Sequence, residues 1–200
     1  MLKKWLREYI QINKREILVI ISFLLLGVII GIATYIFSST EVKELAIASV
    51  REVFEISKAE TYVKTNIILN GVKANIILIA VLAMMSVTLF GKWIIYMITI
   101  LKGIALSIYT IILFNIFGPF LGMITFLLLV ILINIIYIPA FIYIVVCFLD
   151  INFSVFKAKT STTSLYKVTF TIIIGFILMF SSIVLEQLAS TVVLDMYTKM

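Results

Sequence analysis

Long runs of apolar residues determine what this chain can fold into. One run, Ile17–Phe37, holds 21 uncharged residues, and another, Pro119–Leu149, holds 31. A helix rises about 1.5 Å per residue, so the shorter run would span about 30 Å, the thickness of the hydrocarbon core of a bilayer. Of the 200 residues, 64% are hydrophobic and 13% are charged, and a soluble domain of this size could not bury so much apolar surface. The sequence therefore predicts an all-α integral membrane protein.

The hydropathy pattern predicts a single membrane domain, a bundle of about five transmembrane helices. The predicted spans are residues 17–37, 74–90, 93–117, 119–149 and 168–185. Between the first two spans lies the polar segment 38–73, in which five acids balance five bases. Its first half has apolar residues at intervals of three and four, so an extracytoplasmic amphipathic helix is predicted over residues 38–73. It would lie on the bilayer surface, cover part of the bundle, or serve only as a connector.

The distribution of lysine and arginine predicts the orientation of the chain. Residues 1–16 carry five basic residues, and the loop 150–167 carries three lysines against one acid. Cytoplasmic segments are enriched in these residues, so both segments are predicted to be cytoplasmic. The N-terminus then lies inside the cell and the tail 186–200 lies outside. The prediction is a multi-pass protein of the plasma membrane.

Several kinds of chemistry lack their usual residues. The chain has no histidine, and Cys147 is its single cysteine, which excludes an intramolecular disulfide and the common zinc patterns. No glycine-rich phosphate-binding motif is present, and the net charge of +6 fits membrane orientation, not nucleic-acid binding. An intramembrane hydrolase would have to use Glu186 or Asp150, which both stand near the end of a span. We therefore expect no enzyme, no cofactor and no catalytic or metal-binding residue.

The fourth predicted span contains LINIIYIPAF, residues 132–141, in which three residues depart from an otherwise apolar run. Pro139 lacks an N–H group and its ring clashes with the carbonyl of Ile135, so a broken helix is predicted near Pro139. Lipid cannot satisfy the freed carbonyl, and Asn134 supplies polar atoms close by. Such a break requires neighbouring helices to cover it.

Lys102 is the second unusual residue inside a span. It lies about 13 Å into the third span, counted from Trp93. A lysine at the centre of a bilayer costs about 2.5–3.5 kcal/mol on insertion scales. We predict that Lys102 either faces the bundle, capping the carbonyls loosened by Pro139 or reaching Asp150, or extends toward the cytoplasmic headgroups.

Small residues mark candidate contacts between helices. Gly27 and Gly31 form a GxxxG motif in the first span, a pattern that permits close packing of two helices. Gly118 and Pro119 predict a tight outer turn between the third and fourth spans. Glu186 ends the fifth span on the outer side, where its carboxylate is expected at the surface.

Three segments, in this order, carry a resemblance to a known family. Lys102 and Gly103 precede ALSIYTIILFNIFG, the fourth span contains NIIYIPA, and the fifth span ends in VLEQLAS. This order resembles the stage II sporulation protein M family, integral membrane proteins of endospore-forming bacteria, over about residues 66–190. Many members of the wider family carry His-Gly and a Glu before the IPA segment. The corresponding positions here are Asn134, Ile135 and Tyr137, so no role of that His or Glu transfers.

The resemblance implies a non-enzymatic scaffold in the septal or engulfing membrane of the mother cell. The scaffold would recruit two peptidoglycan-degrading partners, the stage II sporulation proteins D and P, for septal thinning and engulfment of the forespore. Membrane lipids are further expected partners, and a second copy of the chain, forming a homo-oligomer, is an additional possible partner. The candidate structural or partner-interface residues are Lys102, Gly103, Asn134, Tyr137, Pro139, Gly27, Gly31 and Glu186.

The residues by themselves leave a second function open. A small transporter or permease subunit for a polar or anionic solute would use polar groups beside a broken helix. Lys102 and Asn134 would then form a sparse solute site. The sequence shows no inverted repeat of the kind that many transporters contain.

Overall fold

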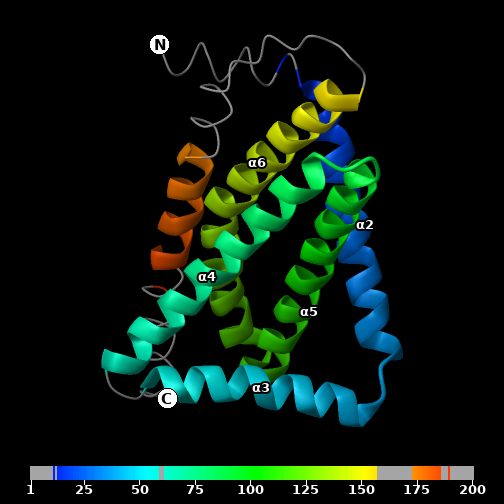
Figure 1. The fold of residues 1–200 in the computed structure, drawn as a ribbon. Helices are drawn as coiled ribbons and strands as arrows, with labels where there is room; N and C mark the ends of the chain where they lie inside the picture. Colours follow the sequence, from blue (N-terminus) through cyan, green and yellow to red (C-terminus); the bar gives the residue numbers. More distant parts are fainter. Residues whose placement is uncertain (1–10, 12, 59–60, 157–172, 186–188, 190–200) are drawn as a thin grey trace.

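A computed structural model describes residues 11, 13–58, 61–156, 173–185 and 189, and these are helical apart from short turns. No strand occurs in this described part of the chain. The helices are α2 (Lys14–Phe37), α3 (Thr40–Lys58), α4 (Thr61–Ser86), α5 (Gly91–Thr125), the π-helical segment η1 (Phe126–Ile131) and α6 (Leu132–Phe156). A further helix covers Ile173–Leu185 and is drawn in orange in Figure 1.

Two helical stretches among the described residues are long and apolar enough to cross a membrane, Lys14–Phe37 and Gly91–Asn152. The second has 62 residues, and Figure 1 shows that it descends as α5 and returns as α6, so it is a helical hairpin. Two other apolar helices, Gly71–Ser86 and Ile173–Leu185, are shorter. The structure therefore supports an all-helical protein with two candidate membrane stretches, a coarser result than the five predicted spans.

The hairpin reverses direction at Gly118. This residue has φ 72° and ψ −179° inside an otherwise helical stretch. Residues other than glycine adopt this backbone conformation only with strain. Pro119 follows at the first position of the next helical turn, where its missing N–H group is not needed. The turn that the sequence predicts at these two residues is present.

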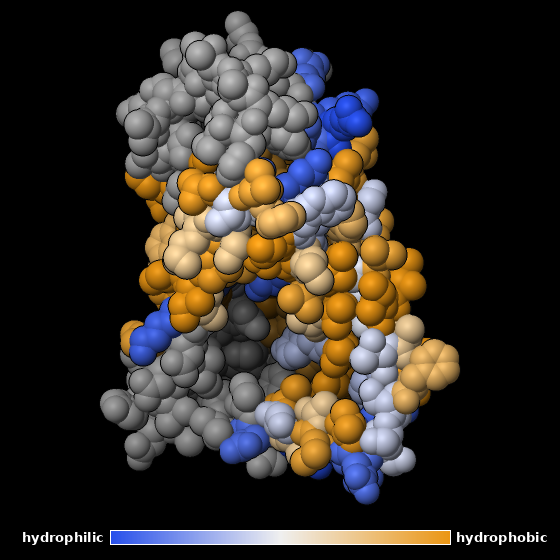
Figure 2. Space-filling view, turned by 45° about the vertical axis from the view of Figure 1, so that its right-hand side comes forward, coloured by the Kyte–Doolittle hydropathy of each residue, from blue (hydrophilic) through white to orange (hydrophobic). Residues whose placement is uncertain are grey.

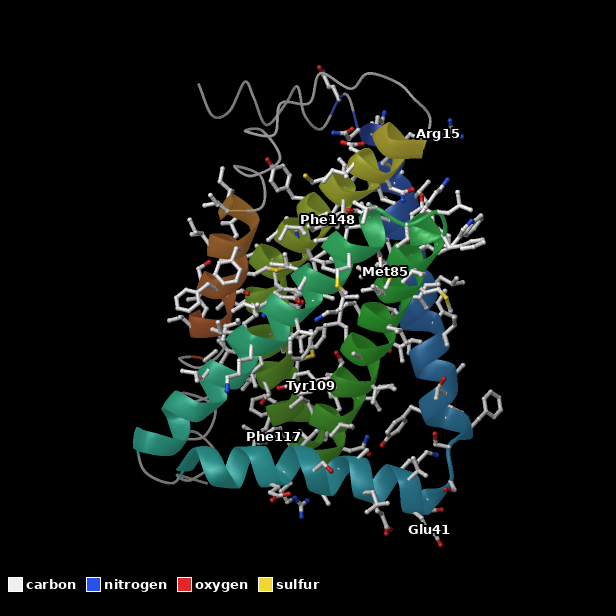
Figure 3. The ribbon with its side chains drawn as sticks, in the orientation of Figure 1. Arg15, Glu41, Met85, Tyr109, Phe117 and Phe148 are labelled. Carbon is white, nitrogen blue, oxygen red and sulfur yellow. The ribbon has the colours of Figure 1, made fainter. Side chains whose placement is uncertain are left out.

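A buried apolar cluster at one end of the bundle joins several helices. Ile20 of α2, Leu82 of α4, Ile95 of α5 and Phe148 of α6 are all almost completely buried in it. A smaller cluster lies toward α3 and includes Leu113, Leu129, Val130, Ile133 and Ala189. Tyr109 and Phe117 pack against this second cluster and lie above α3 in Figure 3.

The amphipathic segment is shorter than predicted. The sequence assigns residues 38–73 to one outer helix, whereas α3 ends at Lys58 and α4 starts at Thr61 and continues to Ser86. The predicted boundary at residue 74 follows a change in composition, but the hydrogen bonds of a helix backbone continue across such a change. Residues 61–73 therefore belong to the same helix as most of the second predicted span.

Helix α3 lies across one end of the bundle, beneath α5 (Figure 1). Ala46, Ile47 and Val50 are half-buried at helical spacing, and Val50 packs against the smaller core cluster. Glu41 and Glu44 are exposed. The sequence allows several arrangements for this segment. In the structure, α3 covers part of the bundle.

The outer surface of the bundle is apolar along its length. Leu25, Ile29 and Leu101 are examples, each with more than half of its surface exposed. Figure 2 shows apolar surface over the sides of the helices and hydrophilic residues gathered toward the two ends. This distribution is the one expected of helices that contact lipid and end in headgroups or water.

The fourth predicted span is not broken at Pro139. Helix α6 runs through this proline from Leu132 to Phe156, which corrects the prediction. A proline can stand inside a membrane helix because local bending and neighbouring groups compensate for the lost hydrogen bond. The departure from α-helical bonding comes earlier, at Phe126–Ile131, where the Leu132 N–H donates to the Leu127 carbonyl five residues back.

Candidate functional site

A chain of hydrogen bonds joins three helices inside the bundle. The Lys102 ammonium on α5 donates to the Tyr137 hydroxyl on α6 at 2.8 Å. That hydroxyl donates to Oδ1 of Asn75 on α4 at 3.0 Å. The Asn75 amide in turn donates to the Gly71 carbonyl, one turn earlier, at 3.1 Å. This polar chain is the candidate functional site.

The direction of every proton in the polar chain follows from the chemistry of Lys102. An ammonium group only donates, so the Tyr137 hydroxyl must accept from it and use its own proton elsewhere. That proton meets the Asn75 oxygen, and the Asn75 amide nitrogen is then left to donate to the Gly71 carbonyl. Asn75 is only 7% exposed, so water contributes little there.

The helices position these side chains rigidly. Tyr137 stacks on Phe141, one turn later on α6, with ring planes only 4° apart and centroids 6.4 Å apart. Phe141 is almost fully buried in the larger core cluster. The stacking fixes the orientation of the phenol ring, so its hydroxyl is held between the side chains of α4 and α5.

Lys102 faces the bundle, as the first of the two sequence-based alternatives predicts, but its acceptor there is different. The prediction names the carbonyls near Pro139 or Asp150, whereas the hydrogen bond goes to the Tyr137 hydroxyl. Tyr137 was named as a candidate residue from the family-like NIIYIPA segment, without a partner. The structure supplies that partner, because α5 and α6 lie against each other in the hairpin.

Asn134 lies in different surroundings from Lys102. Its amide donates to the Val130 carbonyl at 2.7 Å, within the π-helical segment. The wide π-helical turn alters the backbone hydrogen-bonding pattern, and the asparagine amide supplies an additional donor to it. Asn134 therefore supports η1 rather than a carbonyl released by Pro139.

Asn134 and the exposed Pro139 line an open groove between α2, α5, η1 and α6, with a volume of about 740 Å³. Its other lining residues are mostly aliphatic: Val28, Ile32, Leu106, Ser107, Thr110, Ile111, Phe126, Val130, Ile131, Ile135 and Ile138. Lys102 is not among them, and the Lys102 ammonium and the Asn134 amide donate to different acceptors, the Tyr137 hydroxyl and the Val130 carbonyl.

Three glycines bring α2 and α5 into close contact. A Cβ atom on Gly27 would overlap the Ile100 carbonyl, and one on Gly31 would overlap the side chain of Ser107. On the facing helix, a Cβ atom on Gly103 would overlap the Leu24 carbonyl. The GxxxG pair and Gly103, which the sequence singled out separately, thus form one helix crossing within the chain.

No match to this chain was found among protein-family models, curated proteins or solved structures.

Two buried asparagines of the structure were missed by the sequence reasoning. Asn75 belongs to the polar chain, and Asn152 of α6 donates to the carbonyls of Ser86 and Thr88 at 2.9 and 2.8 Å. Asn152 thereby joins the end of α6 to the turn between α4 and α5. A signal was available for Asn75, since it is an amide inside a predicted span, as Asn134 is.

Glu186, the last candidate from the sequence, lies outside the described residues. Within the described part of the chain, no group of three or more His, Cys, Asp or Glu side chains could hold a metal ion. Cys147 is buried in α6.

Proposed function

We propose that this chain is a non-enzymatic membrane scaffold that recruits peptidoglycan-degrading proteins to the septal membrane during engulfment of a forespore. The proposal joins two lines of support, the resemblance to the stage II sporulation protein M family and the construction of the bundle. Its partners would be the stage II sporulation proteins D and P.

One structural observation carries the scaffold proposal: the hydrogen bonds of the polar chain join helices of the bundle to one another. The Tyr137 hydroxyl both accepts and donates, and in the Asn75 side-chain amide the oxygen accepts and the nitrogen donates. Polar groups used in this way fix the relative positions of α4, α5 and α6. A rigid bundle with a largely apolar outer surface suits the binding of other membrane helices.

The proposed placement has five spans, with the N-terminus in the cytoplasm and the tail outside. In this arrangement α3 lies at the extracytoplasmic end of the bundle, on the same side as the cell wall. Helix α3 covers that end, and its exposed Glu41 points away from the bundle (Figure 3). Wall-degrading partners would meet this end first.

The direct test is co-purification. The tagged chain is expressed in sporulating cells, extracted in mild detergent and probed for the stage II sporulation proteins D and P. The scaffold proposal expects both partners in the eluate, and it expects cells without the gene to stall with a thick, flat septum. Co-purification of neither partner, together with solute-dependent flux in vesicles holding the pure protein, would replace the scaffold with a transporter.

A further inference from the structure

We propose that Lys102 recognises a carboxylate on the transmembrane helix of a partner protein, which docks beside α5 on the side where α4 diverges from it. This inference rests on the proposed scaffold function and names the chemistry of the partner that the scaffold recruits.

The first argument is the incomplete hydrogen bonding of the ammonium group. Lys102 has three N–H donors, and its one hydrogen bond within the described residues goes to the Tyr137 hydroxyl. The acceptor is neutral, because the tyrosine keeps its proton for Asn75. No carboxylate among the described residues forms an ion pair with Lys102, whose other contact is with the face of the Tyr137 ring, 5.2 Å from its centroid. The positive charge is therefore held in place without being neutralised.

The second argument is the position of this charge. Lys102 is the only charged residue inside the five predicted spans. It lies about 13 Å from Trp93, near the middle of a hydrocarbon core about 30 Å thick. Ionisable residues at such depth characteristically pair with a partner group or mark a functional path. A lipid phosphate stays at the headgroup level, so it does not reach this depth.

The third argument excludes a second copy of the chain as the source of the carboxylate. All ten acidic residues of the sequence lie outside the predicted spans, as the positions of Glu16, Glu41, Asp150 and Glu186 illustrate. A homo-oligomer would therefore offer Lys102 no acid at its own depth. The carboxylate must come from a different protein.

The described residues also leave a route for such a helix. Lys102 is only partly buried. Asn75 ties α4 to the bundle through Tyr137, and the N-terminal half of α4 then runs away from α5 (Figure 1). Figure 2 shows a hollow in the half of the molecule that lies toward α3. A lipid-facing helix with one acidic residue fits beside α5 at this point.

The test uses the full-length protein in lipid vesicles and a synthetic poly-leucine transmembrane helix with one central glutamate. Association is measured by energy transfer between a dye on the helix and a dye on the protein. The glutamate helix should bind about 5- to 30-fold more tightly than the same helix with glutamine, the range of polar contacts between model membrane helices. Lys102→Met should abolish that difference, whereas Lys73→Met, at an exposed lysine of α4, should preserve it.

Two further variants separate recognition from a purely structural role. Tyr137→Phe removes the hydroxyl but leaves the ammonium, so binding of the glutamate helix should persist or increase. Moving the glutamate two turns toward one end of the synthetic helix should remove the preference. Equal binding of the glutamate helix to the wild type and to Lys102→Met would overturn the proposal.

The failure of this inference is distinguishable from failure of the scaffold function. If proteins D and P co-purify equally with the wild type and Lys102→Met, and the glutamate helix shows no preference, the scaffold stands and the carboxylate proposal is wrong. If the glutamate helix binds as expected but neither protein co-purifies, the site stands and the assignment of the partners is wrong.

Discussion

A methyl group on Gly103 of α5 would lie 3.0 Å from the Cα atom of Gly27 on α2. At this distance the two helix backbones almost touch, and the same methyl group would overlap the Leu24 carbonyl. Such close approach lets van der Waals packing and weak polar contacts hold two membrane helices together without a hydrophobic driving force. The crossing of α2 and α5 is thus the point where the N-terminal helix joins the hairpin.

The first prediction concerns this crossing. Gly103→Ala should destabilise the protein by about 1–3 kcal/mol, because the backbones must separate to admit the added methyl group. Thermal unfolding in detergent micelles would measure the loss. Ala105→Leu, on the exposed side of the same helix, is the control and should leave the unfolding temperature nearly unchanged. Equal effects of the two substitutions would contradict the close crossing.

The turn at Gly118 gives the second prediction. Gly118→Ala should cost about 1–3 kcal/mol, because alanine is strained at this backbone conformation. Apart from its chain neighbours and the adjacent helix backbone, no atom of the described residues lies within 4 Å of the added Cβ, so the cost would come from backbone strain and not from crowding. Urea or thermal unfolding would measure it. Phe120→Ala, at a 74% exposed side chain in the same turn, should change stability by less than about 0.5 kcal/mol.

The polar chain makes the third prediction, a contrast between two of its members. Tyr137→Phe should cost about 1–3 kcal/mol, because it leaves the Asn75 oxygen and the Lys102 ammonium without their partner. Lys102→Met should be neutral or stabilising, because it removes a partly buried charge while the bond between Tyr137 and Asn75 remains. Thermal unfolding of both variants decides the matter. A larger loss for Lys102→Met would mean that the ammonium itself holds the helices together.

Asn152 provides the fourth prediction. Asn152→Ala removes two hydrogen bonds to the carbonyls of Ser86 and Thr88 and should cost about 1–3 kcal/mol. Amide hydrogen exchange should rise between residues 86 and 91, where the turn loses its connection to α6. Ser181→Ala, which removes one exposed bond within its own helix, is the matched control. Unchanged exchange in the turn would show that other contacts hold it.

The proposed topology gives the fifth prediction. With Cys147 replaced by serine, a single cysteine at Ser49 should react with a membrane-impermeant maleimide added to intact cells. A cysteine at Ser161 should react only after the membrane is opened. Ser49 lies on an exposed side of α3, so its reactivity reports the side of the membrane and not burial. The reverse labelling pattern would invert the topology.

Part of the structure could be predicted because it depends on residues close together in the chain. Long apolar runs predicted helices, and the described residues of those runs are helical except for residues 87–90 of the second predicted span, which form the turn after α4. Gly118 and Pro119 predicted the turn of the hairpin, since the backbone freedom of one and the missing N–H of the other are local properties. The sequence also identified Lys102 and Tyr137 as unusual residues in apolar surroundings.

Other features follow only from the packing of helices. Local rules predicted a break at Pro139, yet α6 continues through it and the irregular turn lies at Phe126–Ile131. Lys102 and Tyr137 are 35 positions apart, and Tyr137 and Asn75 are 62 apart. A buried polar group binds whichever complementary group the folded helices bring within about 3 Å, so residue type alone predicts that a partner is needed but not which one it is. The packing of α4, α5 and α6 determines that Tyr137 is the partner of both Lys102 and Asn75.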